Sequence, residues 1–132
     1  MIKKCGRKLQ DSCRIVYINF RLDDFLSGGV NTGEITELCG PVASFKSQLC
    51  MQIASQAASH SGSSVLYVDS GNSFDERRCL SMLGEASSSQ SQRRAAMSRI
   101  STCACFDGFQ LLDALYSAKR KLSEATVCRN FT

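Results

Sequence analysis

The eight residues from Gly40 to Ser47, G-P-V-A-S-F-K-S, have the types and most of the spacing of a loop that binds phosphate. Such a loop requires a glycine, four free positions, a second glycine, a lysine, and then serine or threonine. Its backbone N–H groups and the following helix surround the phosphates, the lysine contacts the outer phosphates, and the hydroxyl holds Mg²⁺. Gly40, Lys46 and Ser47 satisfy the pattern, so ATP and Mg²⁺ are the candidate ligands, with Ser47 as the metal ligand.

Phe45 departs from this pattern because it stands where the second glycine is required. A side chain there is expected to hinder the approach of the backbone to a phosphate and to oppose a positive φ angle, which glycine adopts freely. Pro41, Val42, Ala43 and Ser44 fill the four free positions. Two interpretations stay open: a degenerate nucleotide loop, or a strand-to-helix turn whose lysine and serine begin a helix.

The elements that flank the loop are predicted from the spacing of apolar residues. E-I-T-E-L-C-G at 34–40 alternates and predicts a strand that ends at Gly40. Between Lys46 and His60, apolar residues recur at helical spacing, and S-V-L-Y-V-D at 64–69 is the short apolar run typical of a buried parallel strand. The loop is therefore expected to join a strand to a helix, which is the context that phosphate binding needs.

Two later helices are predicted from their first residues. Ser73 and Glu76 have the spacing of a capping box, which predicts a helix over residues 74–83. Asp107 is expected to cap the last helix, in which leucines share one face: Leu111, Leu115 and Leu122.

Two further strands complete the predicted α/β fold. I-V-Y-I-N-F at 15–20 favours a strand, and R-I-S-T-C-A-C-F at 99–106 predicts a third buried one. The serine-rich segment at 86–92 predicts a flexible loop. Since strands alternate with helices, the sequence predicts a parallel sheet with flanking helices.

Length, net charge and the distribution of apolar residues limit the kinds of protein that this sequence can encode. The 132 residues suffice for one domain, and the formal charge of +4 permits contact with nucleic acid without requiring it, because a solvated charged face explains the basic clusters equally well. The first residues lack the apolar run of a secretory signal and no segment is long enough to span a membrane, which predicts an intracellular protein in a reducing compartment.

The eight cysteines do not have the spacing of a zinc site. The closest pair, Cys103 and Cys105, flanks a single alanine and is expected to point to one face of a strand. Five cysteines lie in apolar patterns and are predicted to behave as small core residues: Cys39, Cys50, Cys79, Cys103 and Cys105. The single histidine, His60, is expected at a helix end.

Several blocks together resemble the RecA-type strand-exchange recombinases of eukaryotes. They are L-D-D-F-L-S-G-G-V-N-T-G-E-I-T-E-L-C-G-P, then K-S-Q-L-C, then V-L-Y-V-D-S-G-N-S-F-D-E-R-R, in this order and at these distances. V-L-Y-V-D-S and F-D-G-F-Q-L-L-D-A-L are similar to the D-type paralogues, which are accessory factors in DNA repair. The resemblance assigns 21–125 to the front half of a RecA-like ATPase core, 1–20 to a non-family segment and 126–132 to a tail.

The resemblance also implies roles for single residues. Gly40, Lys46 and Ser47 take positions of the family's Walker A loop, and Phe45 takes that of its second glycine. Active members carry a glutamate that activates the attacking water two residues beyond the aspartate of V-L-Y-V-D, and that position is Gly71 here. The family continues with an apolar strand ending in a magnesium-associated aspartate and with loops that contact DNA, which are expected beyond Thr132 of an apparently truncated chain.

Three hypotheses on function follow. The first is a nuclear scaffold that binds other recombinase paralogues in homologous recombination, turns over little or no ATP, and meets single-stranded DNA only through the complex. The second is a DNA-dependent ATPase with a functional loop around Lys46 and Ser47. The third is a truncated isoform without independent activity. Phe45, Gly71 and the absent aspartate strand favour the first.

Overall fold

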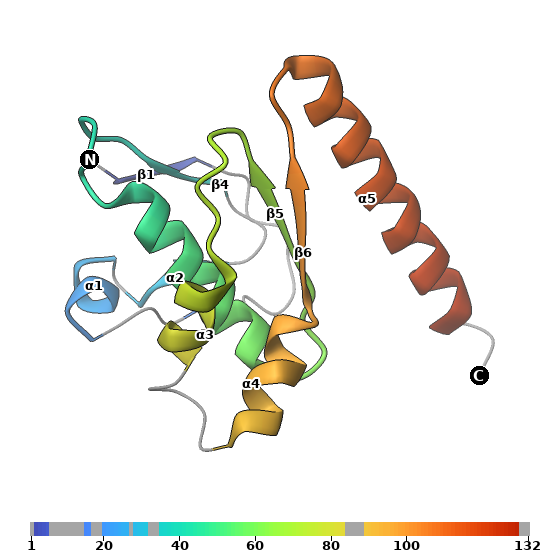
Figure 1. The fold of residues 1–132 in the computed structure, drawn as a ribbon, viewed down its shortest axis with the longest axis horizontal. Coiled ribbons are helices and arrows are strands. Elements are labelled where there is room, and N and C mark those ends of the chain that lie inside the picture. Colours follow the sequence, from blue (N-terminus) through green and yellow to red (C-terminus); the bar gives the residue numbers. More distant parts are fainter. Residues whose placement is uncertain are drawn as a thin grey trace.

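The computed structural model describes residues 2–5, 15–16, 20–26, 28–31, 35–83 and 89–129. In chain order the elements are β1 (Ile2–Cys5), β2 (Ile15–Val16), α1 (Phe20–Phe25), β3 (Val30–Asn31), β4 (Ile35–Leu38), α2 (Lys46–Ser59), β5 (Val65–Asp69), α3 (Glu76–Leu83), α4 (Gln90–Met97), β6 (Ile100–Ala104) and α5 (Gly108–Arg129). Helices α2, α3 and α4 lie on one side of the β5–β6 pair and α5 lies on the other (Figure 1).

Strand pairing confirms the predicted α/β class, although the parallel part is small. β5 and β6 pair in parallel, with Val65 opposite Ile100. β4 pairs antiparallel with β1, and β2 pairs antiparallel with β3. Within the described residues, β4 and β5 therefore do not pair with each other, although both flank α2 in the chain.

The core forms where α2, α3 and α4 meet beside the parallel strands. Ala58, Leu83 and Ala96 are almost completely buried, and three half-buried apolar side chains pack against them: Val65, Met97 and Ile100. The small alanines let the helices approach closely, while Leu83 fills the space between them. This core fixes the position of α2 and therefore of the loop at its beginning.

Local predictions for the middle of the chain are confirmed. The helix predicted from Lys46 is α2, and His60 is its C-cap, with Nδ1 2.9 Å from the carbonyl oxygen of Gln56. The apolar run at 64–69 contains β5. Only five residues separate the end of α2 from the start of β5, so β5 runs back along α2. Its carboxyl end therefore lies near the loop that precedes α2.

Two predictions near the loops need correction. The strand expected at 15–20 is present only at Ile15–Val16, and Phe20 already begins α1, while residues 17–19 lie outside the described part. The loop expected at 86–92 ends earlier, because Ser89 accepts a hydrogen bond from the N–H of Gln92 at 3.3 Å and caps α4. Residues 86–88 lie outside the described part as well.

Helix α5 starts as predicted, but the leucines whose side chains are described are exposed, and the side chain of Leu122 lies outside the described part. The Asp107 carboxylate accepts a hydrogen bond from the N–H of Gln110 at 2.8 Å and caps the helix. Leu111 and Leu115 are 41% and 50% exposed, because α5 turns a largely polar face toward the strands. The strand that lies beneath is also less buried than expected, since side chains of β6 are exposed: Ser101, Thr102 and Ala104.

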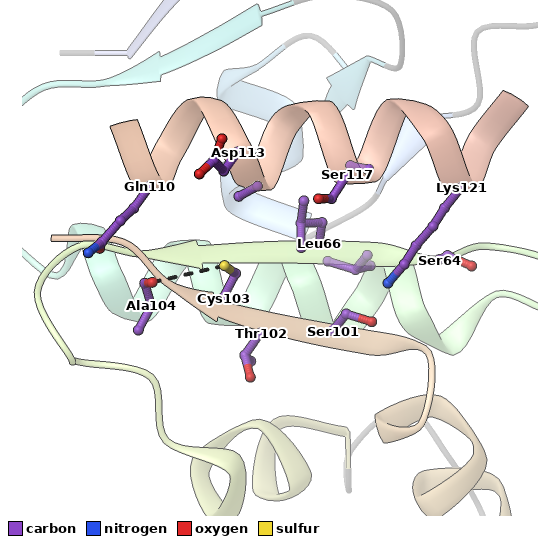
Figure 2. A pocket seen from close by; sticks show the side chains of 13 residues that line it. Ser64, Leu66, Ser101, Thr102, Cys103, Ala104, Gln110, Asp113, Ser117 and Lys121 are labelled. Atoms are coloured by element: carbon purple, nitrogen blue, oxygen red, sulfur yellow. Dashed lines mark hydrogen bonds between the residues drawn. The ribbon is translucent and has the colours of Figure 1, made fainter. Parts of the chain in front are cut away.

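Figure 2 shows Gln110 and Lys121 extending from α5 toward β5 and β6, and Asp113 and Ser117 line the same cavity between them. A cavity of about 630 Å³ separates the helix from the strands. No helix within the described ranges combines the length and apolar character needed to cross a membrane.

Candidate phosphate-binding site

The loop between β4 and α2 contains two residues with positive φ angles, and one of them is Phe45. Ala43 and Phe45 have φ angles of 62° and 60°, in the left-handed region. The side chain at position 45, which was expected to oppose a positive φ, therefore does not exclude one. The Phe45 ring avoids the loop because it points outward and is 77% exposed, and the conformation costs about 1–2 kcal/mol in a residue other than glycine.

Gly40 leaves room for the side chain of Ser44, which would have to move if a larger residue stood at position 40. A Cβ atom added at Gly40 would lie 2.6 Å from Oγ of Ser44, closer than nonbonded atoms approach each other. At the other end of the loop, Phe45 is the N-cap of α2 and provides no side-chain hydrogen bond to the helix. The first N–H groups of α2 and its positive end thus face the loop without a side-chain cap.

The Lys46 side chain folds back across the loop. Its Nζ donates hydrogen bonds to the carbonyl oxygens of Gly40 at 2.9 Å and Pro41 at 2.6 Å, and to Oγ of Ser44 at 3.2 Å. An ammonium has three donors, so all three are used. A bound phosphate would have to replace one of these three acceptors of Lys46. The Ser44 hydroxyl is the easiest to replace, because its hydrogen bond is the longest.

These residues fit a phosphate group. Lys46 supplies a positive charge, the start of α2 supplies N–H groups, and Ser47 is exposed beside them. A nucleotide would be held by this loop and its Mg²⁺ by the Ser47 hydroxyl. Mg²⁺ would supply neutralisation of phosphate charge.

Asp69, at the carboxyl end of β5, holds the neighbouring loop in place. Its carboxylate is 8% exposed and accepts hydrogen bonds from the N–H groups of Phe74 at 2.7 Å and Gly71 at 3.1 Å and from Oγ of Ser73 at 3.4 Å. Burial by itself raises the pKa of this carboxyl, but the hydrogen bonds from Phe74, Gly71 and Ser73 outweigh it and lower the pKa below its ordinary value.

The predicted capping box at α3 is wrong. The carboxylate of Asp75 accepts hydrogen bonds from the N–H groups of Arg77 at 2.9 Å and Arg78 at 3.3 Å, and the helix begins at Glu76. Ser73 donates its hydroxyl to Asp69 instead of capping. A charged carboxylate next to the helix start is the stronger cap, so the helix begins later than predicted.

The space around Gly71, which lies beside the Asp69 carboxylate, is open. A Cβ atom at Gly71 would meet no atom within 4 Å, and its φ is not among the positive values found in the described chain. Of the nearby carboxylates, Asp75 is used as a helix cap. Neither packing nor backbone conformation therefore demands a glycine at this position.

A cavity of about 720 Å³ brings the two halves of the site together. Lys46 and Ser47 line it from α2, and Asp69 and Gly71 line it from the end of β5. The loop residues before Lys46 do not line it: Gly40, Pro41, Val42, Ala43, Ser44 and Phe45. Sequence reasoning missed the role of Asp69, although an aspartate at the carboxyl end of a parallel strand, where ligands bind in such folds, was a signal.

The five cysteines whose side chains are described are free thiols with different surroundings. Cys79 and Cys105 are buried as predicted, and burial raises the pKa of both thiols. Cys50 is exposed, contrary to the prediction that it is a core residue, because it faces the 720 Å³ cavity. The sulfur atoms of Cys103 and Cys105 lie 3.6 Å apart, which confirms that both point to the same side.

Comparison with known proteins gives one family and several relatives. The family model described as Rad51 matches residues 10–128. DNA repair protein RAD51 homolog 4 of Bos taurus is 34% identical over 103 residues, which are 78% of this chain and 32% of the bovine protein. The homologue of the same name in Mus musculus is 33% identical over 103 residues, covering 78% of this chain and 31% of that protein.

A third relative matches a shorter region. DNA repair protein rhp57 of Schizosaccharomyces pombe is 52% identical over 50 residues, covering 38% of this chain and 14% of the yeast protein. The chain thus spans about a third of the length of the mammalian relatives that it matches.

Proposed function

Because the chain belongs to the Rad51 family, we propose that it is an accessory recombinase paralogue that supports DNA repair by homologous recombination as a partner-binding scaffold, with weak or no ATP turnover. Its relatives are named DNA repair proteins, which supports the repair role. The partners are other recombinase paralogues, the compartment is the nucleus, and single-stranded DNA is met through the complex.

Gly71 carries the proposal that turnover is weak or absent. By resemblance, this position belongs to the glutamate that activates the attacking water, and hydrolysis requires a group that orients this water. Gly71 has no side chain, and the nearest buried carboxylate, Asp69, already accepts hydrogen bonds from the loop that follows it. A group bound in three hydrogen bonds with a lowered pKa is a poor base.

Nucleotide binding is a separate matter from turnover. Lys46, Ser47 and the start of α2 fit a phosphate, and Phe45 does not obstruct them because its ring points away. We expect weak binding, since Lys46 must first release Ser44 or a loop carbonyl. Under this proposal a bound nucleotide stabilises the loop and α2 without being consumed.

The open space at Gly71 allows a direct test of turnover. ATP hydrolysis is measured for the wild type, Gly71→Glu and Gly71→Gln; the last has the size of glutamate without its charge. Because a Cβ atom at Gly71 meets no atom within 4 Å, both variants should fold. We expect the wild type and Gly71→Gln at background and Gly71→Glu above it. Wild-type turnover abolished by Lys46→Ala would refute the proposal.

Partner binding is tested by co-expression with other Rad51-family paralogues. The tagged full chain should retain a paralogue through purification and elute with it as one species in size-exclusion chromatography. A well-folded monomer that retains none of them contradicts the scaffold role. Extensive cleavage across α2, β5 and β6 in limited proteolysis would instead support a truncated product without independent activity.

The second candidate function is a DNA-stimulated ATPase. Lys46, Ser47 and the left-handed backbone at residues 43 and 45 favour it. It requires another group to take the place of the missing side chain at Gly71, such as a residue of a partner. ATP turnover that appears only in the complex and is lost in Lys46→Ala would support this candidate.

A further inference from the structure

We propose that Cys103 and Cys105, at the end of β6, form a modification site that a low-molecular-weight disulfide such as glutathione disulfide oxidises reversibly to a disulfide bond within the chain. In the following, the two cysteines are called the β6 thiol pair. Neither of them lines the cavity that holds Lys46 and Asp69, so this proposal does not rest on the proposed function.

The two sulfur atoms of the β6 thiol pair lie within reach of each other. They are 3.6 Å apart, because residues two positions apart in an extended segment project to the same side. Each sulfur would have to move by about 0.8 Å to reach the S–S bond length of about 2.05 Å. An extended backbone separates the two Cα atoms by about 6.6 Å, near the upper end of the range of about 4.4–6.8 Å that disulfides span. A disulfide can therefore form here if the chain shortens slightly.

The two thiols differ in exposure, which gives them different roles. Cys103 is half-buried and lines the cavity of about 630 Å³ between α5 and the strands (Figure 2). Cys105 is only 4% exposed. Burial and the neighbouring Cys103 raise the pKa of the Cys105 thiol, so its reactive thiolate form is less populated. Cys103 is therefore the thiol that attacks the reagent, and Cys105 is the thiol that resolves the intermediate.

The reaction consists of two consecutive thiol–disulfide exchanges. The thiolate of Cys103 attacks one sulfur of glutathione disulfide, an S–S bond to Cys103 forms, and one glutathione leaves as a thiolate. The thiol of Cys105 then loses its proton and attacks Sγ of Cys103, and the second glutathione leaves as a thiolate. Two protein thiols are oxidised to one disulfide, and glutathione disulfide is reduced to two glutathione molecules, which take up the two protons.

Oxidation of the pair would act on the junction between β6 and α5. The N–H of Cys105 donates a hydrogen bond to the carbonyl oxygen of Asp69 at 3.1 Å, next to the ladder pair of Asp69 and Ala104. Two residues later, the Asp107 carboxylate caps α5. Because the disulfide draws the Cα atoms of the pair together, it should weaken the bond to Asp69 and displace the start of α5. A disulfide that requires such a distortion is easily reduced again.

A single proteolytic fragment makes the proposal directly testable. The full chain is treated with glutathione disulfide, the remaining thiols are blocked with N-ethylmaleimide, and the chain is digested with trypsin. Cleavage after Arg99 and Lys119 releases residues 100–119, which contain both cysteines of the pair and no other cysteine. Mass spectrometry should find this fragment without maleimide after oxidation and with two maleimides after dithiothreitol. Two maleimides after oxidation, or a disulfide to another fragment, overturn the proposal.

Single serine variants test the two roles. Cys105→Ser should stop after the first exchange and retain one glutathione on Cys103. Cys103→Ser should carry at least about tenfold less glutathione on Cys105, because burial shields that thiol. Equal amounts, or more on Cys103→Ser, overturn the assignment of roles.

The matched control removes an exposed thiol outside the pair. Cys50→Ser should oxidise within residues 100–119 as the wild type does. Loss of this oxidation in Cys50→Ser would assign the disulfide to Cys50 and overturn the proposal.

Hydrogen exchange on the wild type keeps the test independent of how the variants fold. Oxidation should speed exchange at the N–H of Cys105 and in the first turn of α5 at least about threefold, and dithiothreitol should reverse this change. Unchanged exchange at both places contradicts the proposed effect on the junction. Because these measurements involve neither a paralogue nor a nucleotide, their failure leaves the proposed function intact.

Discussion

Substitutions of Phe45 test the loop geometry directly. The positive φ of its backbone favours glycine at this position, whereas burial of part of its ring favours phenylalanine. The φ of 60° costs about 1–2 kcal/mol in a residue with a Cβ atom, and glycine avoids this cost. The ring is 77% exposed, so its removal forfeits little burial, about 0.5 kcal/mol. Glycine loses about 0.4–1 kcal/mol more than alanine in unfolded-state entropy.

These magnitudes predict the order of two variants. Phe45→Ala keeps the strain and loses the small burial, so its free energy of unfolding should fall by about 0.5 kcal/mol. Phe45→Gly loses the strain as well and should be more stable than Phe45→Ala by about 0.8 kcal/mol, the difference between the centres of these two ranges. At an ordinary helical position the order is the opposite, with glycine about 1 kcal/mol worse than alanine.

Urea denaturation followed by circular dichroism measures both variants beside the wild type. Calorimetry with ATP and Mg²⁺ on the same samples tests the second consequence, that glycine at position 45 admits a phosphate at least as well as phenylalanine. If Phe45→Ala proves as stable as Phe45→Gly, position 45 does not hold a left-handed conformation in solution. The reasoning on the loop would then be wrong.

Three further changes test the elements around the site. Asp69→Asn should lower the free energy of unfolding by about 1–3 kcal/mol at neutral pH. Because the pKa of Asp69 is lower in the folded than in the unfolded chain, its stabilising contribution is present above about pH 4 and disappears as the pH falls through the folded pKa. Denaturation of the wild type and the variant over a pH series measures this loss. Asp75→Ala should cost about 1 kcal/mol in thermal unfolding through the lost cap of α3 and exceed the effect of Ser73→Ala. Leu83→Ala, at a completely buried position, should cost about 2–5 kcal/mol, whereas Leu112→Ala, with a side chain 51% exposed, should cost much less.

The parts of the fold that depend on local sequence were predictable. α2 follows from apolar residues at helical spacing, β5 from a short apolar run, and the cap of α5 from Asp107 ahead of its first turn. The position of Lys46 at the start of a helix followed from the loop pattern itself. In each of these cases the residues that decide the structure lie within a few positions of one another.

The parts that depend on distant residues were not predictable from the sequence alone. Ser73 and Asp75 both can cap α3, and the choice falls to Asp75 because Asp69 engages Ser73. The pairing of β1 with β4 joins residues 30 to 36 positions apart, and no local pattern signals it. The spacing of the leucines in α5 correctly predicted a helix. It did not predict their exposure, because spacing does not say which face of a helix a neighbouring element covers.

The two departures from the phosphate-loop chemistry differ in kind. At position 45 the requirement falls on the backbone, and a phenylalanine meets it at a cost of about 1–2 kcal/mol by turning its ring outward. At position 71 the requirement falls on a side chain, and no backbone conformation of Gly71 replaces a carboxylate. Since the space around Gly71 is open, packing does not account for the glycine either. This chain can therefore keep the ability to bind phosphate without the ability to hydrolyse ATP. Lys46→Ala should remove the binding, and Gly71→Glu should restore some hydrolysis, so the two functions can be tested separately.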